Sequence, residues 1–228
     1  MEAMELPVLK FPWLNVPDFI FMTWIVMALL IITATLATRR LRPVPSPLQN
    51  VFEVIVEFFE KFLTDVVGHT GPRYLPLIAT LGLFILVSNL LGLVPLFKAP
   101  TSNLNTTVAL ALIVFFSYHY FGVKEQGLRA YLSHFIWPIP VLTTIVEVIS
   151  HIVRPVTLSL RLFGNIWGED SVILVLFFLK WLVVPYAILL VVMFPLALFT
   201  SVVQAFVFIM LSSIYIAGAV EAAHHDEH

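Results

Sequence analysis

The chain has 228 residues, of which 60% are hydrophobic and 11% are charged, and it combines a formal net charge of −2 with a mean hydropathy of +1.00. Charged residues make up about 25% of soluble domains, so this composition excludes a soluble globule and indicates an integral membrane protein. The lack of a long basic run argues against a nucleic-acid partner. The absence of cysteine excludes disulfides, thiol nucleophiles and thiolate metal ligands.

A single membrane domain is predicted for residues 1–228, with an outside segment at 1–18 and a first transmembrane helix at 19–38. The cluster Arg39, Arg40 and Arg42 follows this helix. Residues 49–67 differ, because charged and apolar residues recur there at helical spacing. We expect an amphipathic helix that lies at the inner interface or packs on a partner.

Two further transmembrane helices are predicted at 75–97 and 108–122, separated by a polar loop. The segments 139–169 and 171–220 are long enough to form a tilted helical hairpin, and an inside tail follows at 221–228. The predicted fold is an all-α integral membrane protein with about five membrane-embedded helices and one amphipathic interfacial helix.

Lysine and arginine residues in the loops predict the orientation, since cytoplasmic loops carry an excess of them. The lysines Lys10, Lys98 and Lys180 fall on one side of this arrangement. Seven basic residues fall on the other, cytoplasmic side: Arg39, Arg40, Arg42, Lys61, Arg73, Lys124 and Arg129. The N-terminus is therefore expected outside and the C-terminus in the cytoplasm.

Arg161 is the most informative residue, because it lies in an apolar stretch at membrane depth. Even the mildest scales put a mid-bilayer arginine at roughly 2.5–3.5 kcal/mol, so it faces protein or water by default and marks an ion pathway. On a regular helix, six polar residues share an arc of roughly 80° and a length of about 33 Å, close to the ~30 Å hydrocarbon core. They are Glu147, His151, Arg154, Arg161, Asn165 and Glu169. We predict that this polar stripe lines a proton path.

The last helical segment offers a milder polar face. This face consists of Ser201, Gln204, Phe208, Ser212 and Tyr215. An antiparallel hairpin would set Gln204 opposite Arg161, where the amide orients the guanidinium without neutralising it. A carboxylate at that position would form a closed ion pair and occupy the arginine.

Four runs carry a more specific signal, namely SNLLGLVP (88–95), PTSNLNTT (100–107), LSLRLFGNIWGE (158–169) and QAFVFIMLSSIYI (204–216). Together they closely resemble the a subunit of the bacterial F-type ATP synthase membrane sector. The resemblance covers most of the chain from about Leu75 onward, with the motifs in the family's order at compatible spacings.

The resemblance implies a stator subunit in the bacterial inner membrane, placed beside a rotating ring of c subunits and next to the b subunits of the peripheral stalk. Arg161 matches the essential arginine and Gln204 its partner glutamine. Glu147, Asn165 and Glu169 match polar positions that line two aqueous half-channels for protons, and His151 is a further candidate on this path. No cofactor or metal is implied.

The sequence departs from many relatives at Ala197, where they carry an ionisable group. Glu169 is therefore expected to act with water or with other partners. Simpler readings stay open: Glu147 and Glu169 could lie at helix ends near headgroups, and His151 could be a packed, hydrogen-bonded side chain. The tail HHDEH at 224–228 suggests metal chelation, but a solvated tail is the simpler interpretation.

Two other functions compete with the stator. A secondary transporter or channel that works alone predicts internal repeats, which the sequence does not show. A purely structural scaffold leaves the cost of Arg161 unexplained. The chain has no GxxxxGK[ST] phosphate loop, so we expect a non-catalytic subunit.

Overall fold

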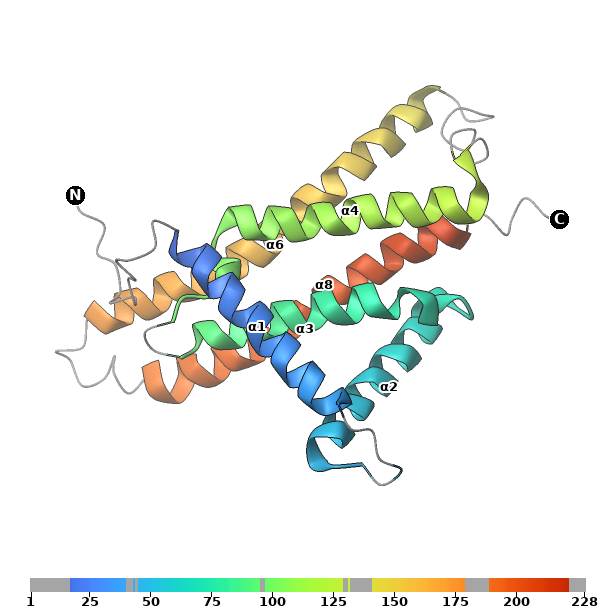
Figure 1. The fold of residues 1–228 in the computed structure, drawn as a ribbon. Coiled ribbons are helices and arrows are strands. Elements are labelled where there is room, and N and C mark those ends of the chain that lie inside the picture. The colour runs from blue at the N-terminus through green and yellow to red at the C-terminus, as the bar shows by residue number, and fades with distance from the viewer. Residues whose placement is uncertain are drawn as a thin grey trace.

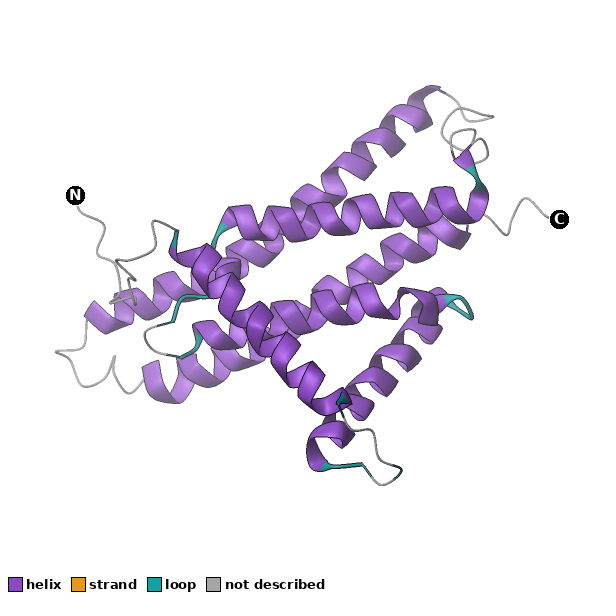
Figure 2. Cartoon of the chain, viewed as in Figure 1, coloured by secondary structure: helices purple, strands orange, loops and turns teal. Residues whose placement is uncertain are grey.

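The computed structural model describes residues 17–39, 43, 45–94, 97–128, 131, 141–178 and 189–221. Every regular element within these residues is a helix (Figure 2), which confirms the predicted all-α class. Most of the predicted outside segment at 1–18 and of the tail at 221–228 lies outside the described residues, as do Arg40 and Arg42.

The helices α1 (Asp18–Thr38), α3 (Leu75–Gly92) and α4 (Leu104–Gln126) cover most of the first three predicted spans. Helix α3 ends before the predicted limit at residue 97, and α4 begins before and ends after the predicted range 108–122. Their apolar residues lie all around the helix, as expected for segments surrounded by lipid and other helices.

The boundaries of α4 follow from local chemistry. The short 3-10 turn η2 (Pro100–Ser102) leads into Asn103, whose side chain accepts a hydrogen bond from the backbone N–H of Asn105 at 2.9 Å. Asn103 therefore caps α4, as expected. The helix ends at Gly127, whose φ of +80° is readily adopted only by glycine.

Helix α2 (Pro47–Val67) covers the predicted amphipathic segment. The Ser46 side chain accepts a hydrogen bond from the backbone N–H of Gln49 at 3.4 Å, and proline at the first helical position favours this start. One face buries Phe59 and Leu63 in the main core, while the charged residues remain outside it.

The C-terminal hairpin consists of α6 (Val141–Phe178) and α8 (Phe194–Glu221), with the π-helical turn η3 (Leu189–Met193) before α8. Helix α6 continues past the predicted end at residue 169. The Ser171 hydroxyl donates a hydrogen bond to the Trp167 carbonyl at 2.7 Å, so the polar residues there do not interrupt the helix.

Helices α3, α4, α6 and α8 run side by side, and α1 crosses over α3 (Figure 1). The start of α4, the end of α6 and the start of α8 gather at one end, which we call the η2 end. The 3-10 turn η1 (Gly71–Tyr74), the end of α4 and the end of α8 lie at the opposite end, which we call the η1 end.

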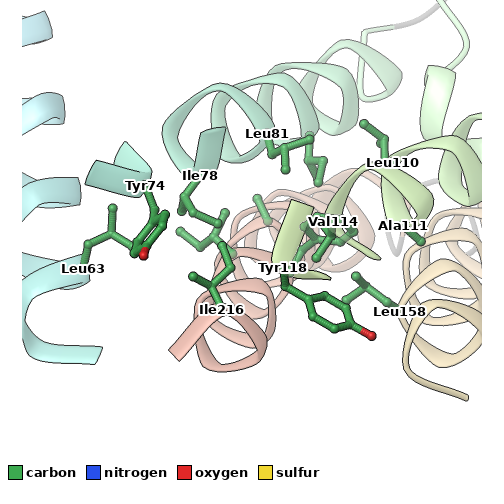
Figure 3. Close-up of a cluster of buried hydrophobic side chains, with 14 of the residues drawn as sticks. Leu63, Tyr74, Ile78, Leu81, Leu110, Ala111, Val114, Tyr118, Leu158 and Ile216 are labelled. Carbon is green, nitrogen blue, oxygen red and sulfur yellow. The ribbon is translucent and has the colours of Figure 1, made fainter. Parts of the chain in front are cut away.

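The core joins side chains from α3, α4, α6 and α8 (Figure 3). At Gly82 of α3 a Cβ atom would lie 2.8 Å from Ile209 and 3.0 Å from Phe59, so the glycine permits close approach. Asn89 of α3 adds hydrogen bonds, since its amide donates to the Ser201 carbonyl of α8 at 3.4 Å and its side-chain oxygen accepts from the Thr101 hydroxyl at 2.7 Å. Lipid tails are as apolar as these side chains, so packing and hydrogen bonds hold the helices together.

Four helical segments of the described chain are long and apolar enough to cross a membrane. They are Asp18–Thr38, Gly71–Gly92, Leu104–Gln126 and Val191–Val220. Helix α6, which carries Asp170 and the six polar residues of the predicted stripe, is not among these four. We call the six residues the α6 stripe. Length and composition of the four segments support a multi-pass membrane protein.

Candidate functional site

Arg161 lies near the middle of α6 on an exposed part of its surface. Its neighbour Leu162 is fully buried in the core, whereas Leu160 is exposed, so Arg161 lies at the edge between the packed and open faces. Within the described residues, Arg161 forms no hydrogen bond and no ion pair. Its charge is therefore available to a group outside this part of the chain.

Gln204 lies on the buried face of α8, with only 7% of its surface exposed. Ser201, Phe208 and Ser212 of the predicted polar face are fully buried, and Tyr215 is half-buried. Helix α8 packs against α6, but no hydrogen bond joins Gln204 to Arg161 in the described structure. The predicted pairing of these two residues stays a prediction.

Glu169 has a partner that sequence reasoning missed. The Thr200 hydroxyl of α8 lies 3.0 Å from the Glu169 Oε2 and donates a hydrogen bond to it. The same hydroxyl also donates to the carbonyl of Ala197 at 3.0 Å. Thr200 lies four residues before Gln204 and therefore one turn away on the same face of α8. This spacing is the sequence signal that could have identified Thr200 as a polar neighbour of the site.

Asp170 is a second residue that sequence reasoning missed. Its carboxyl is half-buried at the η2 end, and Lys98 lies close enough for its positive charge to act on that carboxyl. A surface hollow of about 300 Å³ lies beside Lys98. Pro17, Asp18, Phe19, Ser102 and Asn103 line the rest of this hollow. The η2 end of the hairpin therefore combines two carboxyl groups with a polar opening.

The other end of the α6 stripe has a different chemistry. The His151 Nδ1 lies 3.0 Å from the Tyr118 hydroxyl of α4, and the Arg154 guanidinium lies over the ring of Tyr215, 5.1 Å from its centroid. His151 is thus a packed, hydrogen-bonded histidine that also lies on the stripe. Among the described side chains, the contacts at this end join a histidine, an arginine and two tyrosines, whereas the η2 end has the carboxyl groups of Glu169 and Asp170.

Two predicted site residues are less defined by their contacts. Asn165 is half-buried on α6, one turn beyond Arg161. The backbone of Glu147 belongs to α6, but its side chain lies outside the described residues. The described part of the chain has no group of three or more His, Asp or Glu side chains that could hold a metal ion, and the HHDEH tail lies outside it.

Comparison with known proteins decides the family. The sequence model described as ATP synthase A chain matches residues 20–217, which is most of the chain. The chain belongs to the ATP synthase A chain family. It is 46% identical to ATP synthase subunit a 3 of Pelobacter propionicus over 210 residues, covering 91% of this chain and 89% of the relative. It is 45% identical to ATP synthase subunit a of Geobacter sulfurreducens and 46% identical to that of Geotalea uraniireducens, with the same coverage.

Family membership confirms the resemblance found in the sequence motifs. The chain is a multi-pass, non-catalytic subunit of the membrane sector of ATP synthase, and it works in a complex with other subunits of that enzyme. The unpaired arginine, the carboxyl groups at the η2 end and the His151 region therefore belong to a protein of ATP synthesis and proton transport.

Proposed function

We propose that the chain is the proton-translocating stator subunit, in which Arg161 faces the membrane-embedded carboxylates of a rotating c-ring. One observation carries this proposal: Arg161 is exposed and unpaired within the described structure, although it lies midway along a helix among apolar residues. An isolated guanidinium in hydrocarbon is costly. A ring carboxylate supplies the missing negative charge.

The surface around Arg161 supports a protein neighbour on this side. Leu160 and Val156 of α6 are about half exposed. These side chains form an apolar surface on which the ring helices would slide while the arginine meets each carboxylate in turn.

The two ends of the hairpin supply the two half-channels in this proposal. Glu169 and Asp170 lie toward the η2 end, with the polar hollow beside Lys98, and they form the half-channel that faces outside. Glu147, His151 and Arg154 lie toward the η1 end and form the cytoplasmic half-channel. Glu169 is about 12 Å from Arg161 along the helix axis and His151 about 15 Å, so Arg161 separates the two.

The proton cycle follows from this placement. During synthesis, a proton enters at the η2 end and neutralises a ring carboxylate, which then moves into lipid as the neutral acid. After nearly a full turn the carboxylate reaches the cytoplasmic half-channel and releases the proton. Arg161 favours the ionised carboxylate through its positive charge, and it cannot carry the proton onward because a guanidinium does not deprotonate in proteins. Leakage between the half-channels is thereby blocked.

The orientation places the η1 end in the cytoplasm, with the N-terminus outside a bacterial inner membrane. Arg73 and Glu125 at this end lie 3.3 Å apart in an exposed ion pair, and Lys124 lies beside them in the sequence. This distribution agrees with the excess of basic residues in cytoplasmic loops. The b subunits are the proposed partners on the side away from the ring.

The test uses inverted membrane vesicles that carry the complete complex. Arg161→Ala is expected to abolish ATP-driven proton pumping, while ATP hydrolysis by the detached soluble sector is unchanged. Arg73→Ala is the matched control, because it also removes an arginine but only from an exposed ion pair. We expect normal pumping for that control. Normal pumping by Arg161→Ala would refute the proposed function.

A second measurement addresses the transporter alternative. The chain purified alone and placed in liposomes is expected to show no proton or solute transport, because the ion-binding carboxylate lies on the ring. Transport by the isolated chain would favour a stand-alone transporter instead.

A further inference from the structure

A cluster of histidine and tyrosine side chains fills the space between α4 and α6 toward the η1 end. It contains Tyr118 and His119 of α4, His151 of α6, and Tyr131, which follows α4 in the sequence. We call these four residues the His–Tyr cluster. Only His151 belongs to the α6 stripe, so the cluster extends sideways from the stripe into the interior of the subunit.

Hydrogen bonds and ring contacts connect the cluster. The Tyr118 hydroxyl lies 3.0 Å from the His151 Nδ1, and the Tyr131 hydroxyl lies 2.5 Å from the His119 Nδ1. The ring centroids of His119 and His151 are 5.3 Å apart, and those of Tyr118 and His119 are 4.3 Å apart. Two hydrogen-bonded His–Tyr pairs therefore lie against each other.

The packing around the cluster holds these groups in place. Tyr118 is 1% exposed and Tyr131 is 9% exposed, and Figure 3 shows Tyr118 beside Leu158 at the boundary of α4 and α6. Gly122 makes room for Tyr131, since a Cβ atom there would lie 2.6 Å from a Tyr131 ring carbon. The Gln126 side chain donates a hydrogen bond to the Ala219 carbonyl at 2.7 Å, which ties α4 to α8 nearby.

Arg154 and Tyr215 are charged or titratable side chains of the described chain that contact the cluster. Arg154 of α6 lies beside it, 5.1 Å above the ring of Tyr215, and Tyr215 of α8 lies 6.2 Å from Tyr118. No described carboxylate takes part in these contacts. The cluster thus combines groups that accept and release protons, and the charge of Arg154 acts on Tyr118 and His119.

We propose that the His–Tyr cluster is a proton relay between the α6 stripe and the cytoplasmic surface, a branch of the path that leaves the stripe at His151. This inference rests on the proposed function. It adds His119, Tyr118 and Tyr131 to the groups that move the proton. The described ends of the branch are His151, which belongs to the stripe, and Tyr131, beyond the C-terminal end of α4.

The relay conserves protons at every step. His151 accepts a proton at Nε2 and releases the one on Nδ1 to the Tyr118 oxygen. The Tyr118 hydroxyl proton moves through one water to the His119 Nε2, and the His119 Nδ1 proton passes to the Tyr131 oxygen. The Tyr131 hydroxyl proton then leaves to water. Hydroxyl rotation and a return of each imidazole to its first tautomer reset the chain for the next proton.

The first test removes single hydroxyl groups while keeping the ring shapes. Tyr118→Phe and Tyr131→Phe are measured in vesicles from which the soluble sector has been removed, so that passive proton conduction through the membrane sector is read directly. We expect conduction about tenfold slower in each, since a positioned proton-transfer group contributes at least this much. Tyr120→Phe is the matched control, because Tyr120 is 63% exposed on the same helix and lies outside the cluster. It is expected to conduct like the unmodified complex.

The second test separates proton transfer from packing. His119→Ala is expected to slow conduction to the same degree and to regain most of it when imidazole is added. Pyrazole has nearly the same size and is a far weaker base, so it should not restore conduction. Equal rescue by both compounds, or none by imidazole, would assign His119 a packing role and overturn the relay.

These outcomes are distinguishable from a failure of the proposed function. If Tyr118→Phe and Tyr131→Phe conduct normally while Arg161→Ala abolishes pumping, the stator function stands and the relay is wrong. If Arg161→Ala pumps normally, the stator function itself is wrong. The amount of assembled complex, measured by immunoblot in the same vesicles, identifies a variant that fails to fold, and the hydroxyl variants keep the packing that folding needs.

Discussion

Helices α2 and α6 are both amphipathic, but they differ in whether their basic side chains form ion pairs. On α2, Lys61 lies 2.8 Å from Glu57, both side chains are exposed, and the lysine lowers the pKa of Glu57 from its ordinary value of 4.5 through a hydrogen bond and charge attraction. On α6, Arg161 forms no ion pair within the described chain. The charges of α2 pair with each other, whereas Arg161 is left for another molecule.

The difference shows where charge serves solubility and where it serves function. Exposed pairs such as Glu57–Lys61 contribute little stability, because water screens them and the long side chains lose freedom on pairing. An unpaired arginine at membrane depth is destabilising for the isolated subunit. The fold keeps Arg161 unpaired only because a partner, in our proposal the c-ring, uses its charge.

The strongest test of this contrast keeps the positive charge of Arg161 but changes its chemistry. Arg161→Lys is expected to reduce ATP-driven pumping at least about tenfold, because a desolvated ammonium loses its proton readily and a guanidinium does not. Pumping in inverted vesicles gives the measurement. Full activity of this variant would mean that any positive charge at this position is sufficient for pumping.

The next test compares the two members of the contact at the η2 end. Glu169→Gln removes an ionisable group from the proposed path and is expected to lower ATP synthesis at least about tenfold, since a positioned proton-transfer group typically contributes about 100-fold or more. Thr200→Val removes only the hydroxyl that donates to Glu169 at 3.0 Å and should cost a few-fold at most. Synthesis rates under an imposed proton gradient separate the two. Equal losses would assign Thr200 a direct place on the path.

A smaller effect is expected when a charge is added opposite the arginine. Gln204→Glu places a carboxylate at the position predicted to face Arg161, where it would form the ion pair that Arg161 lacks. We expect synthesis to fall several-fold with the complex still assembled. Unaltered rates would show that Gln204 and Arg161 do not face each other.

The smallest effect is expected on α2. Lys61→Ala removes the partner of Glu57, and we expect no measurable change in pumping or in the amount of complex between pH 6 and 8. Because the folded-state pKa of Glu57 is lowered, its contribution to stability is present at neutral pH and is lost only as the pH falls through the acid range below 4.5. A large loss of pumping or of assembled complex at neutral pH would show that the Glu57–Lys61 pair binds another subunit. Its charges would then serve a partner, as we propose for Arg161.

Several features of the site could be predicted from the sequence. The position of Arg161 within an apolar run, and its alignment with Asn165 and Glu169 on one helical arc, follow from the 3.6-residue period alone. The buried character of Gln204, Phe208 and Ser212 follows from the same spacing on α8. Periodicity fixes which residues share a face, because it is a local property of the backbone.

The partners of these residues could not be predicted in the same way. Thr200 beside Glu169, Lys98 near Asp170 and Tyr118 beside His151 each join residues that are distant in the sequence. Such contacts depend on how far one helix is shifted and rotated against the next. That placement is set by close approaches such as Gly82 against Ile209, for which the sequence gives no local signal.

The sequence by itself determined that this protein is a helical membrane protein of the ATP synthase A chain family, because hydropathy, helical period and motif order are written along the chain. Only the tertiary structure decided which polar groups meet. The His–Tyr cluster is the clearest case, since it draws on α4, on α6 and on the residue Tyr131 between them. A hydrogen bond requires atoms within about 3 Å of each other, and only the packing of the helices brings these side chains that close.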